Sequence, residues 1–545
     1  MKDLFIHYSY YLMWGVCLVW VWVCSRTVLA NEERIISKLQ SARWSLLFIF
    51  IFTFAAFLNA HPSLRVLADQ TNLLAVAKSM TFEKTVRMPT EGTWGFENFR
   101  VLTWEIPTRP LLYPFLIHLV HGLSGYRIEN AYAVNFICLL AYLVFFYFLT
   151  ERWLGKKWGL AAVVLIASQP LVTQTSASAA MEFTNAVFFF AAMGSVAWYL
   201  KKPSAETLLF LWANLLMLGH TRYESALLAF ATLVFLAAAR LIAWADVRRH
   251  APIYVFTPIL CLPLFWQRLL TQGEYNCPAD RALTPFTLAN LREHAAAFFG
   301  ETLRLGHLLP YDGMLPYANV VNLAGLAALL FFLIRFLISK KRPTKSDLWF
   351  GLIFGLNLGL FYIIIASYYL GMPDQPTFAR YYVILVTVLT MSALWFMNHV
   401  RVFRKKPLLV LAFTAVCFFT YHSSSMENRF SNRQYLVREY NFAMSFLKKE
   451  TDKNFLLIHD RPGLFVVSDY GAITFTLANR NREGTLLDFK RHFYRDIFVL
   501  QRIEYKTGQP EKDCVLDGTY KLETLTELQN GADFFFRLSK VIPPK

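Results

Sequence analysis

Long apolar blocks alternate with short polar segments along most of the chain. Twelve such blocks, each about 14–23 residues long, are followed by polar or basic residues. At 1.5 Å per residue, a helix of about 20 residues crosses a hydrocarbon core roughly 30 Å thick. The pattern therefore predicts a polytopic α-helical membrane protein with about twelve spans. The expected spans are 5–25, 43–60, 130–150, 158–172, 183–200, 207–220, 225–243, 251–270, 319–338, 348–370, 381–399 and 407–420.

Composition supports this interpretation. Of the 545 residues, 56% are hydrophobic and 17% are charged, whereas a soluble protein has roughly 25% charged residues. This balance excludes a disordered chain and an ordinary soluble enzyme. The net charge of +17 does not require a nucleic-acid partner, because basic residues gather in short loops of membrane proteins.

The distribution of basic residues predicts the orientation. One set of loops holds 21 lysines and arginines, whereas the short opposite loops 173–182, 221–224 and 371–380 hold only Arg222 and Arg380. The basic loops are expected on the cytoplasmic side of the cytoplasmic (inner) membrane. Both chain ends and the long segments 61–129, 271–318 and 421–545 then lie on the outer side.

Three regions are expected. Residues 1–42 form an extra N-terminal span, retained because no cleavage signal follows it, with a cytoplasmic loop. Residues 43–420 form the main transmembrane module. Residues 421–545 form a small extracytoplasmic α/β domain, with strands at Phe455–His459, Leu464–Val467 and Ile497–Leu500 and a helix at Thr519–Asn530.

The first outer loop contains two predicted helices. Apolar residues at helical spacing predict an amphipathic helix over 68–80, with Asp69 in its first turn. There the helix dipole favours a carboxylate, so Asp69 is either a site residue or a plain stabilising residue. A second helix is predicted within 109–125: Pro110 and Pro114 can sit in its opening turn, and apolar residues from Leu112 to Leu123 share one face. It is expected either in the membrane interface or packed within the loop. The other charged residues of this loop, among them Arg65, Lys78, Glu83, Glu91, Glu97 and Glu105, are expected on a solvated surface.

Three charged residues lie at the outer ends of spans. They are Glu182, Arg222 and Arg380, the last followed by Tyr381. Ionisable residues at membrane depth are costly and often functional, although snorkelling and helix pairing also occur at span ends. Carboxylates can act as bases or metal ligands, and arginines bind phosphate in a bidentate manner.

These motifs occur in an order that resembles the GT-C superfamily of membrane glycosyltransferases. The order is Asp69, Arg109-Pro-Leu-Leu-Tyr-Pro114, Ala-Met-Glu182-Phe, Thr-Arg222-Tyr-Glu224 and Phe-Ala-Arg380-Tyr-Tyr. It is most similar to the bacterial branch with protein O-mannosyltransferases and the lipid A aminoarabinose transferase. The resemblance covers roughly residues 43–400. Many relatives carry two adjacent acidic residues where this chain has Asp69-Gln70.

The resemblance implies a sugar transfer from a polyprenyl-phosphate donor to a lipid, glycan or protein acceptor at the outer membrane face. Asp69 matches the catalytic carboxylate, and Glu182 a second acidic position. Arg222 and Arg380, with the adjoining Tyr381, match the region that binds the lipid phosphate. Further candidates for substrate binding are Arg109, His220 and Glu224.

The chemistry of these residue types agrees with such a reaction. A carboxylate can deprotonate an acceptor hydroxyl, and arginines can stabilise a phosphate leaving group. A single displacement would invert the anomeric centre. Three alternatives remain: a transporter or flippase of lipid-linked saccharides, a polysaccharide ligase or polymerase, and a non-catalytic membrane assembly protein that displays the 421–545 domain. Transporters usually place charges near the midplane and show repeats, which are not seen in this sequence.

Cofactor and disulfide predictions are limited. The sequence has no zinc-spaced Cys/His cluster, and a divalent metal ion, if used, would be held by Asp69 and Glu182. Cys277 and Cys514 lie in the outer segments, where they could pair in an oxidising compartment or remain free thiols.

Overall fold

The computed structural model describes residues 1–65, 67–95, 98–271, 285–303, 316–338, 344–373, 376–426, 435–450, 452–531 and 533–543. The chain divides into two units. The helical unit comprises Met1–Ser63, Thr108–Leu116 and Ala131–Phe430. The sheet unit comprises Leu64–Pro107, Ile117–Asn130 and Ser431–Lys545.

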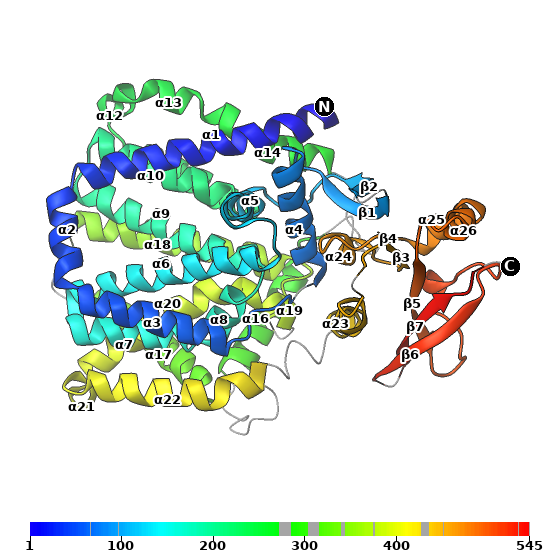
Figure 1. Ribbon diagram of the computed structural model, residues 1–545. Coiled ribbons are helices and arrows are strands. Elements are labelled where there is room, and N and C mark those ends of the chain that lie inside the picture. The colour runs from blue at the N-terminus through cyan, green and yellow to red at the C-terminus, as the bar shows by residue number, and fades with distance from the viewer. Residues whose placement is uncertain are drawn as a thin grey trace. The chain divides into compact units, whose positions relative to one another are not determined.

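Long helices run side by side in the helical unit (Figure 1). Its helices are α1 (Lys2–Leu29), α2 (Glu32–Ser41), α3 (Arg43–Asn59), α6 (Glu129–Leu154), α7 (Lys156–Ala167), α8 (Pro170–Ser176), α9 (Met181–Lys201), α10 (Ala205–Gly219), α11 (Tyr223–Ala238), α12 (Trp244–Arg249), α13 (Ala251–Val255), α14 (Thr257–Leu270), α16 (Leu288–Leu303), α17 (Pro316–Ile338), α18 (Lys345–Ser367), α19 (Pro376–Ala379), the 3-10 helix η2 (Arg380–Tyr382), α20 (Val383–His399), α21 (Arg401–Arg404) and α22 (Pro407–Met426).

Every predicted span coincides with at least one of these helices. Within the described ranges, six helices are long and apolar enough to cross a membrane, and the number reaches eight when each bent pair counts as one span. The bent pairs are α2 with α3 and α7 with α8, each at 71°. The helical unit is thus that of a multi-pass membrane protein, and the figure of twelve spans stays a prediction.

Helix α9 lies at the centre of the helical unit. Of its most apolar 18 residues, 72% are buried, and α9 packs against α10, α18 and α20. Phe189 and Phe190 of α9 are buried, and the centre of the Phe190 ring lies 5.0 Å from the centre of the Phe146 ring on α6. This packing fixes the position of α9, which carries Glu182 in its first turn.

The sheet unit is built on a seven-stranded sheet in the order β2-β1-β4-β3-β5-β7-β6. β3 is parallel to β4 and β5, and the other pairs are antiparallel. The strands are β1 (Met88–Gly95), β2 (Asn98–Glu105), β3 (Phe455–Ile458), β4 (Ala472–Ile473), β5 (Asp496–Glu504), β6 (Leu522–Asn530) and β7 (Phe534–Val541). The first two strands come from the first outer loop and the other five from the C-terminal segment.

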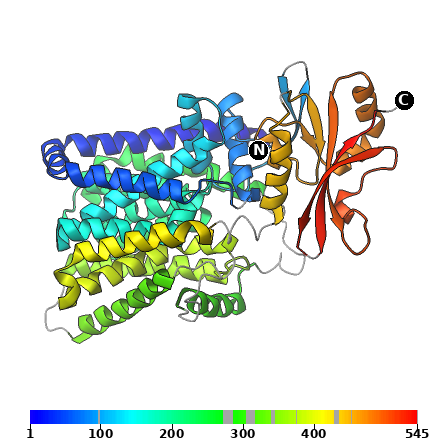
Figure 2. The same ribbon diagram turned by 60° about the horizontal axis from the view of Figure 1, so that its bottom comes forward.

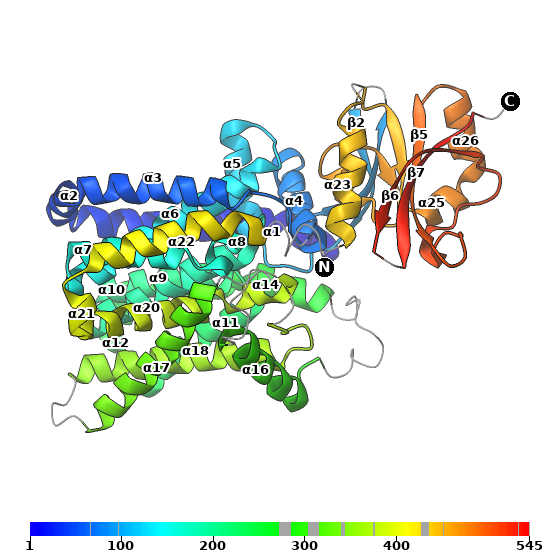
Figure 3. The ribbon, with the colours of Figure 1, turned by 90° about the horizontal axis from the view of Figure 1, so that it is seen from below.

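Helices cover both faces of this sheet (Figures 2 and 3). On one face, Phe446 of α23 packs against Phe498 of β5, with the two ring centres 5.4 Å apart. On the other face, Ala478 and Phe489 belong to the same buried cluster as Ile497. The helices of this unit, together with α5, which both units share, are α4 (Leu67–Phe82), α5 (Leu112–Ser124), α23 (Tyr435–Leu447), α24 (Gly463–Val466), α25 (Phe475–Arg480), α26 (Arg482–Lys490) and the 3-10 helix η4 (Lys512–Cys514).

Several sequence predictions for this unit are confirmed and others are wrong. The helix at 68–80 and the helix within 109–125 are present as α4 and α5, and the strands at 455–459 and 497–500 as β3 and β5. The predicted strand Leu464–Val467 is instead helix α24, which begins directly after Pro462 and fits the preference of proline for the start of a helix. The predicted helix Thr519–Asn530 is instead β6, where pairing with β7 overrides the helix propensity of Leu and Glu.

The first outer loop also differs from the prediction. It supplies the hairpin of β1 and β2, and Gly92 of β1 pairs with Ala472 of β4. Arg65, Lys78 and Glu91 are buried at 5%, 6% and 6% exposure, so they are not surface residues. Glu97 lies outside the described residues. The sheet unit therefore combines loop residues, which the prediction assigned to the transmembrane module, with the C-terminal segment.

Candidate functional site

Glu182 is held at the N-terminal end of α9 by a backbone anchor. The chain enters α9 through Ala180 in an extended conformation. Asn135 on α6 donates from Nδ2 to the carbonyl oxygens of Ser178 at 2.6 Å and Ala180 at 3.0 Å. These bonds fix the entry of the helix, so the carboxylate in its first turn has a defined position.

Two arginines from distant parts of the chain meet this carboxylate. Arg222 is the N-cap residue of α11, and Arg380 begins η2. Arg222 Nη1 lies 2.9 Å from Glu182 Oε1, and Arg380 Nε lies 3.1 Å from the same oxygen. Glu182, Arg222 and Arg380 are exposed by only 4%, 6% and 6%. Ion pairs this deeply buried depend on mutual compensation of their charges.

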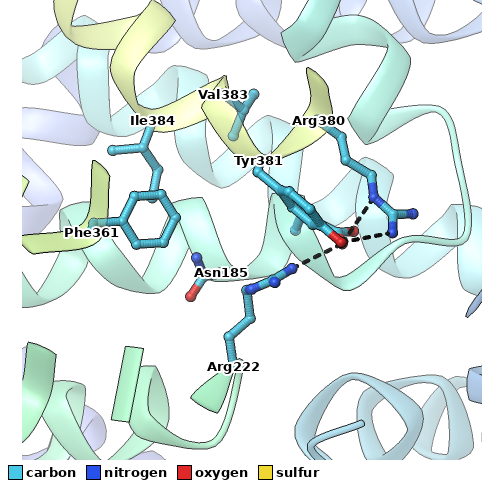
Figure 4. A pocket seen from close by; sticks show the side chains of 8 residues that line it. Asn185, Arg222, Phe361, Arg380, Tyr381, Val383 and Ile384 are labelled. Carbon is cyan, nitrogen blue, oxygen red and sulfur yellow. Dashed lines mark hydrogen bonds and ion pairs between the residues drawn. The ribbon is translucent and has the colours of Figure 1, made fainter. Parts of the chain in front are cut away.

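Glu224 and Tyr381 complete the surroundings of the arginines. Glu224 accepts from Arg222 Nε at 3.2 Å and from Nη2 at 3.1 Å, a bidentate pair. The guanidinium carbons of Arg222 and Arg380 lie 4.6 Å and 5.2 Å from the centre of the Tyr381 ring. Figure 4 shows the two arginines reaching toward Tyr381 from different elements. The ring therefore fixes both cations by cation–π contacts.

Four residues of this cluster, Glu182, Arg222, Arg380 and Tyr381, line a small pocket. Its lining residues are Glu182, Asn185, Arg222, Phe361, Arg380, Tyr381, Val383 and Ile384 (Figure 4). Asn185 Oδ1 accepts hydrogen bonds from Thr221 at 2.6 Å and Ser225 at 2.5 Å. The sequence analysis did not predict four of these lining residues. One of them, Asn185, follows Glu182 by three residues, a helical spacing that indicates a shared face. Phe361, Val383 and Ile384 carry no such signal.

Other candidates from the sequence lie apart from this pocket lining. Arg109 is half-buried in the helical unit, and its carbonyl oxygen accepts from Gln267 Nε2 at 2.7 Å. His220 is fully buried and is the C-cap residue of α10. Neither residue lines the pocket.

Asp69 lies in the sheet unit, in the first turn of α4, and is half-buried. Its role as the catalytic carboxylate therefore stays a prediction. Cys514 is buried at the end of η4. Cys277 lies outside the described residues, so the disulfide also stays a prediction.

The pocket does not suit a divalent cation at Glu182. The carboxylate oxygen that would bind it already faces two guanidinium groups at 2.9 Å and 3.1 Å. A cation bound there would be repelled by both arginines. Arg222 and Arg380 are the groups of this pocket that can bind an anion.

A second charged cluster lies in the sheet unit. The potential ligand atoms of Glu439, His459 and Asp460 lie within 4.8 Å of one another. Arg502 Nη2 donates to Asp460 at 3.0 Å, and the backbone N–H of Arg461 donates to His459 Nδ1 at 3.0 Å. Because Nδ1 accepts, Nε2 keeps the ring proton, and Nε2 lies 3.2 Å from one oxygen of Glu439 and 3.2 Å from one oxygen of Asp460. We therefore interpret the cluster as a buried network of charged and hydrogen-bonding groups. Burial alone would raise the pKa of Asp460, but His459 and Arg502 outweigh burial, and the pKa of Asp460 is lowered.

Part of the chain matches a known family. Residues 108–266 match the family model of the dolichyl-phosphate-mannose-protein mannosyltransferases. The matched stretch includes Arg109, Glu182 and Arg222. The resemblance to GT-C membrane glycosyltransferases is thus confirmed for this part of the chain.

Comparison with curated proteins gives no match. Among solved structures, ArnT from Cupriavidus metallidurans in the apo state aligns at 13% identity and a TM-score of 0.46, covering 92% of this chain and 98% of ArnT. The same protein bound to undecaprenyl phosphate aligns at 12% identity and a TM-score of 0.45, with the same coverage. The arabinosyltransferase EmbB from Mycobacterium smegmatis aligns at 12% identity and a TM-score of 0.31, covering 71% of this chain and 42% of EmbB.

Proposed function

We propose that this protein is a membrane glycosyltransferase that moves a sugar from a polyprenyl-phosphate donor to an acceptor at the outer face of the cytoplasmic membrane. One observation carries the proposal: two buried arginines converge on one oxygen beside a pocket, in a chain whose residues 108–266 match a family of lipid-phosphate-dependent mannosyltransferases. The excess of basic residues in the opposite loops supports the outer-face location.

Arg222, Arg380 and Tyr381 form the phosphate-binding part of this proposed site. When the sugar leaves, the lipid phosphate takes the bonding electrons and needs positive charge rather than a strong acid. Two guanidinium groups that converge on one oxygen can stabilise that charge through charge-assisted hydrogen bonds. The prenyl tail stays in lipid, which explains why such a site belongs among membrane helices.

Asp69 is the proposed general base. It would take the proton from the acceptor hydroxyl as the oxygen attacks the anomeric carbon, and the single displacement would invert that centre. Glu182 is the second acidic residue of the site, and its contacts to Arg222 and Arg380 indicate that it positions these arginines.

Substitution Asp69→Asn tests the proposal. It removes the base with little change in shape, so we expect sugar transfer to fall by about 10²–10⁴-fold. The measurement is mass analysis of surface glycans and glycolipids in cells that lack the protein and carry each variant. Asp513→Asn, at an exposed position of the same unit, is the matched control and should retain activity. Full activity of the Asp69 variant would contradict its role as base.

A further inference from the structure

One carboxylate oxygen in the pocket occupies the position that suits a phosphate oxygen. Glu182 Oε1 is approached by Arg222 Nη1 at 2.9 Å and by Arg380 Nε at 3.1 Å, with both arginines buried. Phosphate oxygens accept charge-assisted hydrogen bonds from guanidinium groups at this distance. The carboxylate and the phosphate therefore compete for the same donors.

The ion pairs of the cluster join two carboxylates to two arginines. Glu182 and Glu224 compensate Arg222 and Arg380 through the ion pairs described above. An anionic phosphate entering beside both carboxylates would leave excess negative charge in a buried site, which is costly at low dielectric. One carboxylate must therefore leave the arginines when the phosphate binds.

The contacts indicate which carboxylate leaves. Glu224 binds the Nε and Nη2 edge of Arg222 and makes no ion pair with Arg380 among the described contacts. It fixes the direction of the Arg222 guanidinium. Glu182 instead lies between the two arginines. Because Glu182 lies in the first turn of α9, the helix dipole stabilises its charge after it turns away from them.

We propose that Glu182 holds the place of the donor's phosphate oxygen before the donor binds and is displaced from Arg222 and Arg380 when the anionic lipid binds. This inference rests on the proposed function. It also gives Glu182 a part in product release, since its return to the arginines competes with the polyprenyl phosphate that remains after sugar transfer.

The test measures binding of undecaprenyl phosphate, with uncharged undecaprenol as the control ligand, to the full-length protein in lipid nanodiscs. Glu182→Gln removes the competing charge, so we expect the lipid phosphate to bind at least about fivefold tighter than to the wild type. The ligand should also raise the unfolding temperature of this variant by more than that of the wild type, because unliganded Glu182→Gln leaves its arginines undercompensated.

Glu224→Gln is the matched control, since it removes one negative charge beside the same arginine. Affinity in this variant should stay equal or fall, because Arg222 loses its bidentate partner. Equal tightening in both variants would mean that net charge alone acts and would overturn the inference. Glu182→Asp takes the place of Glu182→Gln in this test if the latter fails to fold. It keeps the charge on a shorter side chain that cannot reach both arginines, so it should bind the lipid phosphate more tightly than the wild type.

The arginine variants separate this inference from the proposed function. Arg222→Gln and Arg380→Gln should lose binding of the lipid phosphate. If they lose it and neither Glu182 variant binds more tightly, Glu182 is not a placeholder and the phosphate site stands. If both arginine variants bind like the wild type, the phosphate site itself is wrong.

Discussion

Lys78 shows how a single buried charge holds parts of the sheet unit together. Its ammonium group lies 2.6 Å from Asp469 Oδ1, donates to the carbonyl oxygen of Val466 at 2.7 Å and lies 4.0 Å from the centre of the Phe99 ring. Burial lowers the pKa of Lys78, although Asp469 acts in the opposite direction. These contacts tie α4, which carries Asp69, to the chain beside α24.

Replacing Asp469 and replacing Lys78 should lower the stability of the protein by different amounts. Asp469→Asn leaves the ammonium group, exposed by 7%, without its counter-charge, and we expect the free energy of unfolding to fall by about 1–3 kcal/mol. Lys78→Met should cost less, because the Asp469 carboxylate is 31% exposed and can be hydrated. Asn also tolerates the left-handed backbone of position 469, at φ 59°.

Chemical denaturation followed by hydrogen exchange of peptides from α4 is the appropriate measurement. A greater loss in Lys78→Met than in Asp469→Asn would show that the hydrogen bond to Val466 and the contact with the Phe99 ring, and not the pairing with Asp469, stabilise α4.

At the scale of elements, the close packing of α17 against α20 depends on a glycine. A Cβ atom added to Gly325 of α17 would lie 2.1 Å from the carbonyl oxygen of Leu389 on α20. That distance is far inside van der Waals contact and involves backbone, which cannot rotate away. Small residues allow such close approach of membrane helices.

Gly325→Ala should therefore force α17 and α20 apart and lower the thermal stability of the protein in detergent. Overpacking of this kind typically costs about 1–3 kcal/mol. Gly355→Ala on α18 is the control, since no atom lies within 4 Å of its added Cβ, and alanine there should be neutral or stabilising by up to about 1 kcal/mol. Equal stability of both variants would contradict the packing of α17 on α20.

The elements that the sequence predicts well are those whose cause is local. Apolar length alone identifies all twelve helical blocks, and apolar spacing identifies α4 and α5. Strand β6 was missed because its structure depends on pairing with β7. Residue order predicted that Glu182, Arg222 and Arg380 belong together, and the structure brings them into contact. The sequence could not show that Glu224 orients Arg222, because that contact depends on the turn before α11.

At the scale of the whole chain, segments more than 350 residues apart in sequence form one sheet. Glu91 of β1 is central to this junction, since its Oε1 accepts from the backbone N–H of Thr474 at 2.9 Å and from the Thr474 hydroxyl at 2.7 Å. Its Oε2 accepts from Thr103 on β2 at 2.7 Å. Thr474 is the N-cap residue of α25, so the carboxylate also lies where the helix dipole favours it.

Glu91→Ala should therefore loosen the join between the first outer loop and the C-terminal segment. Loss of the buried acceptor leaves the Thr474 donors unsatisfied, at a cost of about 1–3 kcal/mol. Because α4 packs on β1, hydrogen exchange should increase in β1, α25 and α4 and stay unchanged in α9. Sugar transfer should fall as well if Asp69 acts from α4.

Glu523→Ala, exposed on β6, is the control and should shift stability by no more than about 0.5 kcal/mol. Unchanged exchange in α4 together with lost activity would show that Glu91 acts on the reaction directly and not through the sheet.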